Sequence, residues 1–322
     1  SNVIASSLSL HTKTGGIIPD VAAREQVKHI IPVIDKAIKE SSLKIKDIDS
    51  IAVTYGPGLI GSLLVGVETA KTLAFIWQKP LIPVNHLYGH IYANFINSEL
   101  YPKRYTLNAN IEFPAICLVV SGGHTDLVLM ESHKKITWLG GTKDDAAGEA
   151  FDKVGRLLGL LYPAGSLIER LAGSVTKDIY NFPRPIINTY GFDFSFSGLK
   201  SAVFREVERI KTKNGKLSQT DIKNFSLATQ NAIFEVLIKK TLLACEKFGA
   251  KSLILGGGVA ANSKLREQFK LEIRNLKLEI PLFVPEKRLC TDNAAMIASA
   301  AFFNYNEILW QKLEANPELY FD

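Results

Sequence analysis

The segment Val84–Ala93, VNHLYGHIYA, holds two histidines whose spacing suggests chemistry. His86 and His90 are four positions apart, so on a helix their imidazoles lie on one face and could bind one metal ion, as in HExxH metallopeptidases. Leu87, however, stands where such a peptidase has the glutamate that activates water. Metal ligands and two ordinary polar residues at a helix start are therefore both open interpretations. Asp292, beside an expected helix N-terminus, is the candidate third ligand.

Two glycine-rich stretches indicate loops that could hold phosphate groups. VSGGHT, at Val120–Thr125, lies in an expected hairpin turn and lacks the GxxxxGK[ST] pattern of a P-loop. LGGGVAANSKL passes from an expected strand into a helix, whose N-terminus favours a phosphate or a nucleoside. Each alone could be a tight turn, but together with DDAAGEAFDK between them they favour a nucleotide cleft. Gly89, between the two histidines, would permit another group to approach closely.

Alternating strand and helix patterns predict an α/β protein. Residues 48–77 and 251–269 each read as a strand, a glycine loop and a helix, which suggests an internal duplication. FPAICLVVSGGHTDLVLM reads as a hairpin, and residues 221–249 read as a long helix that ends at Gly249.

Two further helices raise local questions. DAAGEAFDKVGRLLGL is expected to be helical, with Asp144 or Asp145 as its N-cap. AAREQVKHIIPVIDKAIKES contains Pro32, which predicts either a kink or the junction of two helices.

Composition bounds the class of protein. A chain of 322 residues, 47% hydrophobic and 22% charged, fits two globular domains. The net charge of +6 permits a polyanionic partner such as RNA, but it equally fits a basic protein with scattered lysines. Cys117, Cys245 and Cys290 form no CxxC pair, which suggests reduced thiols in a cytosol-like compartment. With no unbroken apolar run of bilayer length and no basic-then-apolar N-terminus, we expect neither a membrane partner nor a secretory signal.

Eight motifs in order, from about Ser9 to about Ser299, carry a resemblance to a known family. They are GGIIPDVAAREQ, TYGPGLIGSLLVG, HLYGH, VSGGHTDL, DDAAGEAFDK, DFSFSGLK, GGGVAANSKLR and CTDNAAMIA. The chain resembles the tRNA threonylcarbamoyltransferase (TsaD) family, which has archaeal and mitochondrial members. The resemblance implies an actin-like, ribonuclease-H-like (ASKHA) α/β fold of two related domains with an interdomain cleft. The first domain would span residues 1–112, with a C-terminal helix at about 292–310 packed near it, and the second residues 113–291.

The resemblance also implies an activity and its site. The family transfers a threonylcarbamoyl group from threonylcarbamoyl-AMP to the N6 amine of the adenosine 3′ of the anticodon in ANN-decoding tRNAs. It implies one divalent metal, Fe²⁺ or Zn²⁺, bound by His86, His90 and Asp292 in the cleft. ATP, ADP or AMP would compete for the donor's place. The implied donor-binding residues are Val119, Val120, Ser121, Gly122, Gly123, Asp152, Gly165, Glu169 and Asn262.

This chain departs from the family pattern in three places. Glu169 stands where many relatives have an aspartate, and Ala164 replaces the first glycine of a Gly-Gly pair, which would strain the loop if that position needs a positive φ. Family members also begin with two further strands, so we expect the given sequence to be an incomplete version of the natural one. No residue identifies itself as the general base, although Asp145 and Glu149 lie near the site by motif position.

The implied partners are tRNA and either a related actin-like subunit with a small ATPase, as in bacteria, or a second copy of the chain, as in mitochondria. The implied location is the cytoplasm, with the mitochondrial matrix as the alternative.

Two rival functions stay open, a metallopeptidase and a catalytically silent actin-like nucleotide-binding partner protein. The absent glutamate counts against the first, and the intact metal-ligand set counts against the second.

Overall fold

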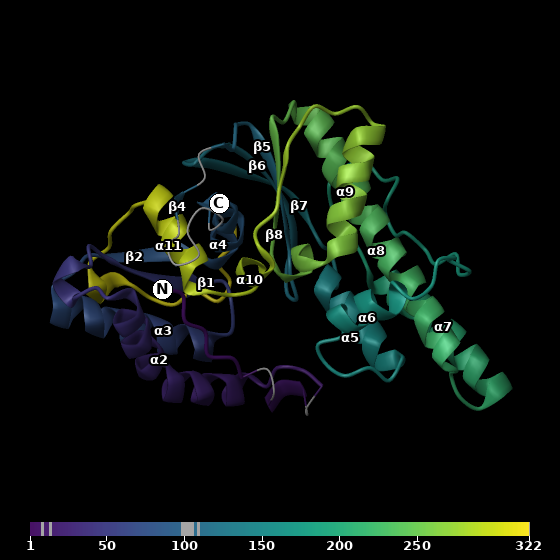
Figure 1. Ribbon diagram of the computed structural model, residues 1–322, viewed down its shortest axis with the longest axis horizontal. Coiled ribbons are helices and arrows are strands. Elements are labelled where there is room, and N and C mark those ends of the chain that lie inside the picture. The colour runs from purple at the N-terminus through teal and green to yellow at the C-terminus, as the bar shows by residue number, and fades with distance from the viewer. Residues whose placement is uncertain (8–9, 13–14, 98–105, 108–109, 322) are drawn as a thin grey trace. The chain divides into compact units, whose positions relative to one another are not determined.

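The protein is described by a computed structural model that covers residues 1–7, 10–12, 15–97, 106–107 and 110–321. The chain divides into two compact units, unit 1 (Ser1–Ile111 with Pro285–Asp322) and unit 2 (Glu112–Val284). Figure 1 shows that both units combine helices with strands. The predicted α/β class is therefore confirmed.

Unit 1 is built on a pair of parallel strands covered by helices. β1 pairs with β2 from Ile51 opposite Leu81 to Thr54 opposite Val84. Apolar residues of α3 pack with Leu81 and with Leu313 from the C-terminal segment. The predicted strand, glycine loop and helix are confirmed, because β1, the loop after Gly56 and α3 follow one another. The elements of unit 1 are α2 (Pro19–Ser41), β1 (Ile51–Gly56), α3 (Ile60–Trp77), β2 (Leu81–Asn85), α4 (His86–Tyr92), β3 (Ile96–Asn97), β4 (Thr106–Leu107), α10 (Lys287–Cys290) and α11 (Ala294–Phe303).

Helix α2 continues past Pro32 as one helix of 23 residues, so the alternative of two separate helices is wrong. Pro32 is exposed, which lets water satisfy the carbonyl that the proline ring leaves without its helical partner. The helix ends at Ser42, whose φ of 59° is the left-handed conformation typical of a C-terminal cap.

Helix α3 is long and apolar enough to cross a membrane by length and composition alone, although the sequence contains no unbroken apolar run. Only 22% of it is buried. Its apolar sequence is interrupted by Glu68 and Lys71, which form an ion pair of 2.9 Å, and its Val67 and Ala70 are core residues of unit 1. One helix of this kind is weak evidence for a membrane span, since core helices of soluble proteins pass the same test.

Unit 2 contains a five-stranded mixed sheet in the order β7-β6-β5-β8-β9. β5, β6 and β7 form an antiparallel meander, whereas β8 is parallel to β5 and β9 is parallel to β8. The hairpin predicted for FPAICLVVSGGHTDLVLM is confirmed as β5 and β6. The elements of unit 2 are β5 (Ala115–Val120), β6 (Thr125–Ser132), β7 (Lys135–Gly141), α5 (Ala147–Leu157), α6 (Gly165–Ala172), α7 (Ser197–Asn214), α8 (Gln219–Phe248), β8 (Ser252–Gly256), α9 (Ser263–Asn275) and β9 (Leu282–Phe283).

The 30-residue helix α8 is the main support of the unit 2 core. It begins with a capping box, in which the Ser218 hydroxyl accepts from the Asp221 amide and the Asp221 carboxylate accepts from the Ser218 amide. It ends at Gly249 with a φ of 57°, as the sequence predicts. Its buried Phe225 stacks on Tyr180 with ring centroids 4.6 Å apart. The helix thereby packs against the segment between α6 and α7.

Candidate functional site

Helix α4 positions the two histidines. Asn85, the last residue of β2, caps the helix by accepting a hydrogen bond of 2.9 Å from the Leu87 amide, and its own amide donates to the Tyr320 carbonyl. His86 is consequently the first residue of the helix, and His90 lies one turn later. Their ring centroids are 4.7 Å apart at an interplanar angle of 75°. The shared helical face predicted from their spacing is confirmed.

Close packing of α11 on α4 brings Asp292 to the histidines. A Cβ atom on Gly89 would lie 2.7 Å from Ile297 Cδ1 and 3.3 Å from Met296, so glycine lets the two helices approach without displacing these side chains. Asp292 immediately precedes Asn293, which caps α11 by accepting from the Met296 amide. Helix α11 is therefore the group that approaches Gly89, and Asp292 lies just before its start.

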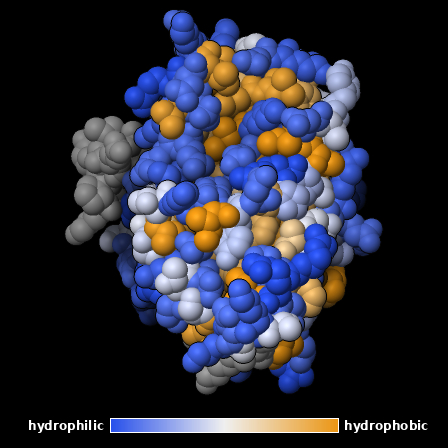
Figure 2. All heavy atoms as spheres, turned by 90° about the vertical axis from the view of Figure 1, so that its right-hand side faces the viewer, coloured by the Kyte–Doolittle hydropathy of each residue, from blue (hydrophilic) through white to orange (hydrophobic). Residues whose placement is uncertain are grey.

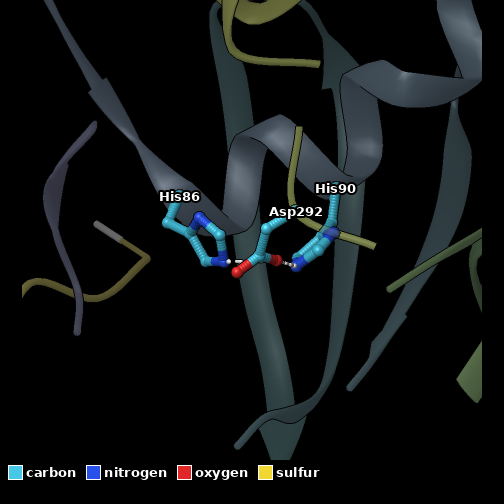
Figure 3. Close-up of side chains that lie close together, drawn as sticks. All are labelled: His86, His90 and Asp292. Carbon is cyan, nitrogen blue, oxygen red and sulfur yellow. Dashed lines mark ion pairs between the residues drawn. The ribbon is translucent and has the colours of Figure 1, made fainter. Parts of the chain in front are cut away.

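The three side chains converge on one point, as Figure 3 shows. Asp292 Oδ1 lies 3.4 Å from His86 Nε2 and 3.6 Å from His90 Nε2, and the ligand atoms of all three residues lie within 4.8 Å of one another. Two donors on a tetrahedral ion at bond lengths of about 2.1 Å would be roughly 3.4 Å apart. Two imidazoles and one carboxylate at these separations therefore fit a single divalent ion. The His90 side chain is 2% exposed and that of Asp292 77%, so the set opens to solvent on the Asp292 side.

In unit 2, the candidate phosphate-binding turn joins β5 to β6. The Ser121 amide donates to the His124 carbonyl at 2.9 Å, and the His124 amide donates to the Ser121 hydroxyl at 3.2 Å. The carbonyl of Ser121 accepts from the Gly148 amide of α5 at 3.1 Å. These bonds hold the turn by its ends. Gly122 and Gly123, at its tip, are exposed.

The glycines around this turn fall into two kinds. A Cβ on Gly148 would lie 2.5 Å from the Ser121 carbonyl oxygen, and one on Gly257 would lie 2.3 Å from the Val120 carbonyl oxygen. Those two glycines permit α5 and the loop after β8 to reach the turn. A Cβ on Gly122 or Gly123 would meet no atom within 4 Å. Packing within the described part of the chain thus does not require glycine at the tip, whereas a ligand that approaches the backbone closely would.

This distinction predicts a stability difference between two neighbouring glycines. Gly257 has a φ of +93° besides its contact with Val120, whereas a Cβ on Gly258 would meet nothing within 4 Å. We expect Gly257→Ala to lower the free energy of unfolding by about 2–4 kcal/mol, because strain and overpacking add. Gly258→Ala is the matched control and should change it by less than about 0.5 kcal/mol. Urea titrations of both variants measure the difference, and equal losses would contradict this assignment.

Helices α5 and α6 place the next two predicted donor residues side by side. Asp152 Oδ1 accepts a hydrogen bond of 2.7 Å from the Ala164 amide, immediately before Gly165 at the start of α6. Burial raises the pKa of Asp152, and Glu149 adds to the rise, whereas the Ala164 amide and Arg156 oppose it. Ala164 has a φ of −88°, so this position needs no glycine conformation and the strain considered for it is absent.

The last two predicted donor residues meet at the N-terminus of α9. Asn262 caps α9 by accepting from the amides of Lys264 and Leu265, and its side-chain amide donates to Gln230. Glu169 Oε1 accepts from the Ser263 amide at 2.8 Å. The turn therefore contacts α5, α5 contacts the start of α6, and α6 contacts the start of α9. The loop after β8, which precedes α9, lies against the end of β5 beside the turn. All the predicted donor residues lie in unit 2, and all the predicted metal ligands lie in unit 1.

The N-cap predicted for α5 is wrong. Ala146 holds that position without a side-chain bond, while the Thr125 hydroxyl accepts from the Ala147 amide at 2.8 Å. Asp144 instead caps α7. Its carboxylate accepts hydrogen bonds from the amides of Phe196 and Ser197 and from the hydroxyls of Ser195 and Ser197. Burial opposes ionisation of Asp144, but these hydrogen bonds together lower its pKa.

The two acidic residues considered as general bases are paired with a lysine. Lys153 Nζ lies 2.5 Å from Asp145 Oδ1 and 2.7 Å from Glu149 Oε1. The hydrogen bond that Lys153 donates to Asp145, followed by that to Glu149, raises the pKa of Lys153. These ion pairs do not identify either carboxylate as a general base.

Comparisons with solved structures give the fold. The chain superposes on the full-length HypF structure in its phosphate- and nucleotide-bound form with a TM-score of 0.59 at 14% identity, covering 84% of this chain and 49% of that one. For the T. kodakarensis HypF the TM-score is 0.57 at 14% identity, covering 86% and 43%. The chain thus spans about half or less of the HypF proteins, and the likeness concerns the fold alone.

Comparisons with sequences give the family. The profile of the tRNA N6-adenosine threonylcarbamoyltransferase family matches residues 1–299. Relatives described by that name are 47% identical in Persephonella marina, over 95% of this chain and 84% of the relative, and 46% identical in Moorella thermoacetica, over 99% and 90%. A relative from Staphylococcus haemolyticus is 43% identical over 99% and 88%. This chain therefore belongs to the tRNA N6-adenosine threonylcarbamoyltransferase family.

Proposed function

We propose that this protein transfers a threonylcarbamoyl group from threonylcarbamoyl-AMP to the N6 amine of the adenosine 3′ of the anticodon in ANN-decoding tRNAs. Family membership supports the reaction, an acyl transfer onto tRNA. The single structural observation that carries the proposal is the convergence of His86, His90 and Asp292. Three protein ligands leave a position for substrate on a four-coordinate ion, as in other catalytic metal sites.

In this proposal, His86, His90 and Asp292 hold one Fe²⁺ or Zn²⁺ ion, because imidazole and carboxylate ligands suit both. When bound, the ion would polarise the donor carbonyl as a Lewis acid. His90 is buried and Asp292 is exposed, so a substrate would approach from the Asp292 side. The chain's own contribution is to hold the two imidazoles in fixed orientation on the capped helix α4.

Unit 2 would bind the donor's adenylate. Ser121 and His124 use their amides to close the turn, so among the contacts of the described residues the amides of Gly122 and Gly123 are left to face a phosphate. The open space around both glycines supports this assignment. The remaining donor contacts that we propose are Val119, Val120, Asp152, Gly165, Glu169 and Asn262. ATP, ADP or AMP would occupy the same place.

We further propose that units 1 and 2 are the two related actin-like, ribonuclease-H-like domains. The sheet of unit 2, an antiparallel meander continued by parallel strands, supports this, as does the fold likeness to HypF. The relatives named above are bacterial, which favours a cytoplasmic location and an assembly with a related actin-like subunit and a small ATPase over a homodimer in the mitochondrial matrix.

A metallopeptidase is the rival function that the metal ligands suggest. Leu87, at the position of the glutamate in an HExxH site, is fully buried and therefore faces the core. No carboxylate stands there to activate water for peptide hydrolysis.

The proposal is tested with the purified full chain, unmodified tRNA and threonylcarbamoyl-AMP. We expect nucleoside mass spectrometry of the tRNA to reveal threonylcarbamoyladenosine, in an amount that a chelator abolishes and added metal restores. A peptide library incubated in parallel should remain uncleaved. Peptide cleavage without tRNA modification would replace this proposal by the peptidase, and nucleotide binding with neither activity would favour a silent partner protein.

A further inference from the structure

The loop between α6 and α7 exposes a tyrosine at its tip. The Tyr190 side chain is 96% exposed, whereas Phe192, two residues later, is buried. An aromatic ring normally contributes to stability by leaving water, so a ring held in solvent gains little for the fold by burial. The exposure of this ring suggests that Tyr190 has a role at the protein surface.

A buried lysine holds the backbone on both sides of this tyrosine. Lys240 of α8 is 1% exposed, and its Nζ donates to the Thr189 carbonyl at 3.0 Å, the Thr189 hydroxyl at 3.3 Å and the Gly191 carbonyl at 2.9 Å. Burial lowers the pKa of Lys240, which reflects the cost of removing an ammonium group from water. The loop tip is therefore fixed, and Tyr190 is presented on an ordered backbone.

Two more lysines of the same helix flank the tyrosine. Lys239 Nζ donates to Asn188 Oδ1 at 2.7 Å. Lys247 Nζ lies between three rings, 5.4 Å from the Tyr190 centroid, 5.2 Å from that of Phe192 and 5.7 Å from that of Phe248. Leu243, 46% exposed, lies midway between them in sequence, and the spacing of four places all three on one face of α8. We call Asn188, Tyr190, Lys239, Leu243 and Lys247 the Tyr190 patch. The side of the protein shown in Figure 2 is mainly hydrophilic, with hydrophobic residues in separate small groups.

This combination of groups fits RNA better than protein. Protein interfaces are depleted in lysine at their cores, whereas single-stranded nucleic acids are bound by aromatic rings that stack on bases beside cations that meet phosphates. Two acidic residues of α8 lie near these lysines in sequence. Glu235, one turn before Lys239, is paired with Arg184 at 2.7 Å, whereas Glu246, next to Lys247, is exposed.

We propose that the Tyr190 patch is a tRNA-contact surface, in which Tyr190 stacks on an unpaired base and Lys239 and Lys247 contact phosphates. The inference rests on the proposed function, since it takes the substrate to be tRNA. It adds residues of unit 2 that are not among the proposed donor-binding residues.

The stacking role is tested with the full chain and unmodified tRNA by fluorescence anisotropy. We expect Tyr190→Ala to raise the tRNA Kd about tenfold or more, because stacking of one base is lost, while Tyr190→Phe, which keeps the ring, stays within about twofold of wild type. The melting temperature should not change in either variant, since the ring is exposed. Tyr305→Ala, which removes a 56% exposed tyrosine of unit 1, is the matched control and should leave the Kd unchanged.

The phosphate role is tested by salt dependence. We expect Lys247→Gln to reduce the slope of log affinity against log salt concentration by about 0.7–0.9, the value for one released counterion. Lys270→Gln, at an exposed position of α9, is the control. If wild type modifies tRNA but Tyr190→Ala binds it equally well, this inference is overturned and the proposed function stands. If wild type neither binds nor modifies tRNA, both are overturned.

Discussion

Replacing His90 by alanine should remove the metal and the transfer activity together. His90 Nε2 lies 3.6 Å from Asp292 Oδ1 and next to the His86 ring, so its loss leaves two ligands where three converge. We expect the bound metal to fall from about one equivalent to less than about 0.1 and the activity on unmodified tRNA to fall by at least about 100-fold. Metal content by mass spectrometry and threonylcarbamoyladenosine formation measure the two effects. A variant that keeps a full equivalent of metal and its activity would make both histidines ordinary structural residues.

Three further variants separate metal binding from folding. His29→Ala removes an exposed histidine of α2 and should leave the metal content unchanged. Leu87→Ala removes a fully buried side chain next to His86 and should cost about 2–5 kcal/mol of stability while the metal is retained. Asp292→Asn alters a side chain that is 77% exposed, so we expect weaker metal binding with little change in the melting temperature of the metal-free protein.

Replacing Gly123 by valine should weaken nucleotide binding without unfolding the protein. A Cβ at this position meets nothing within 4 Å, so the added side chain has room in the ligand-free fold. It would, however, occupy the space through which a phosphate reaches the backbone amides of the turn. We expect the affinity for ADP or for a stable donor analogue to fall at least about tenfold, or 1.4 kcal/mol, by calorimetry.

The control for this variant is Gly173→Val. Gly173 is exposed at the end of α6, and its Cβ would make an ordinary contact of 3.5 Å with the Glu169 carbonyl oxygen. Both variants should keep about one equivalent of metal, because the proposed metal ligands belong to unit 1. Unchanged nucleotide affinity in a folded Gly123→Val protein would show that the turn does not bind the donor.

Local periodicity determined the elements that carry these residues. The spacing of four in His86 and His90 needs only a helix to bring the rings onto one face, and Asn85 starts that helix at His86. The hairpin that holds the glycine turn and the helix that ends at Gly249 likewise follow from short-range patterns. Such patterns are readable from sequence because the residues concerned interact within one or two turns of chain.

Long-range packing decided what those elements do. The sequence pattern alone left Asp292 a candidate, and it becomes a partner of the histidines because Gly89 lets α11 pack against α4. Asp144 looked like the cap of the helix that follows it. It caps α7 instead, since the pairing of Thr142 with Phe194 brings the start of α7 within reach of its carboxylate.

Tertiary contacts also distinguish glycines and lysines that look alike in the sequence. From sequence, Gly123 and Gly257 are both members of glycine-rich loops, but only the fold reveals that Gly257 must admit the Val120 carbonyl while Gly123 faces open space. Lys239 and Lys240 are neighbours in the chain, yet one is exposed and the other is buried beneath the loop at Thr189. The sequence by itself determined the family, the helical register of the histidines and the α/β class. Which glycines admit neighbouring backbone, which carboxylate reaches the two histidines and which lysine becomes structural were decided by tertiary contacts, because each depends on an atom supplied by a distant part of the chain.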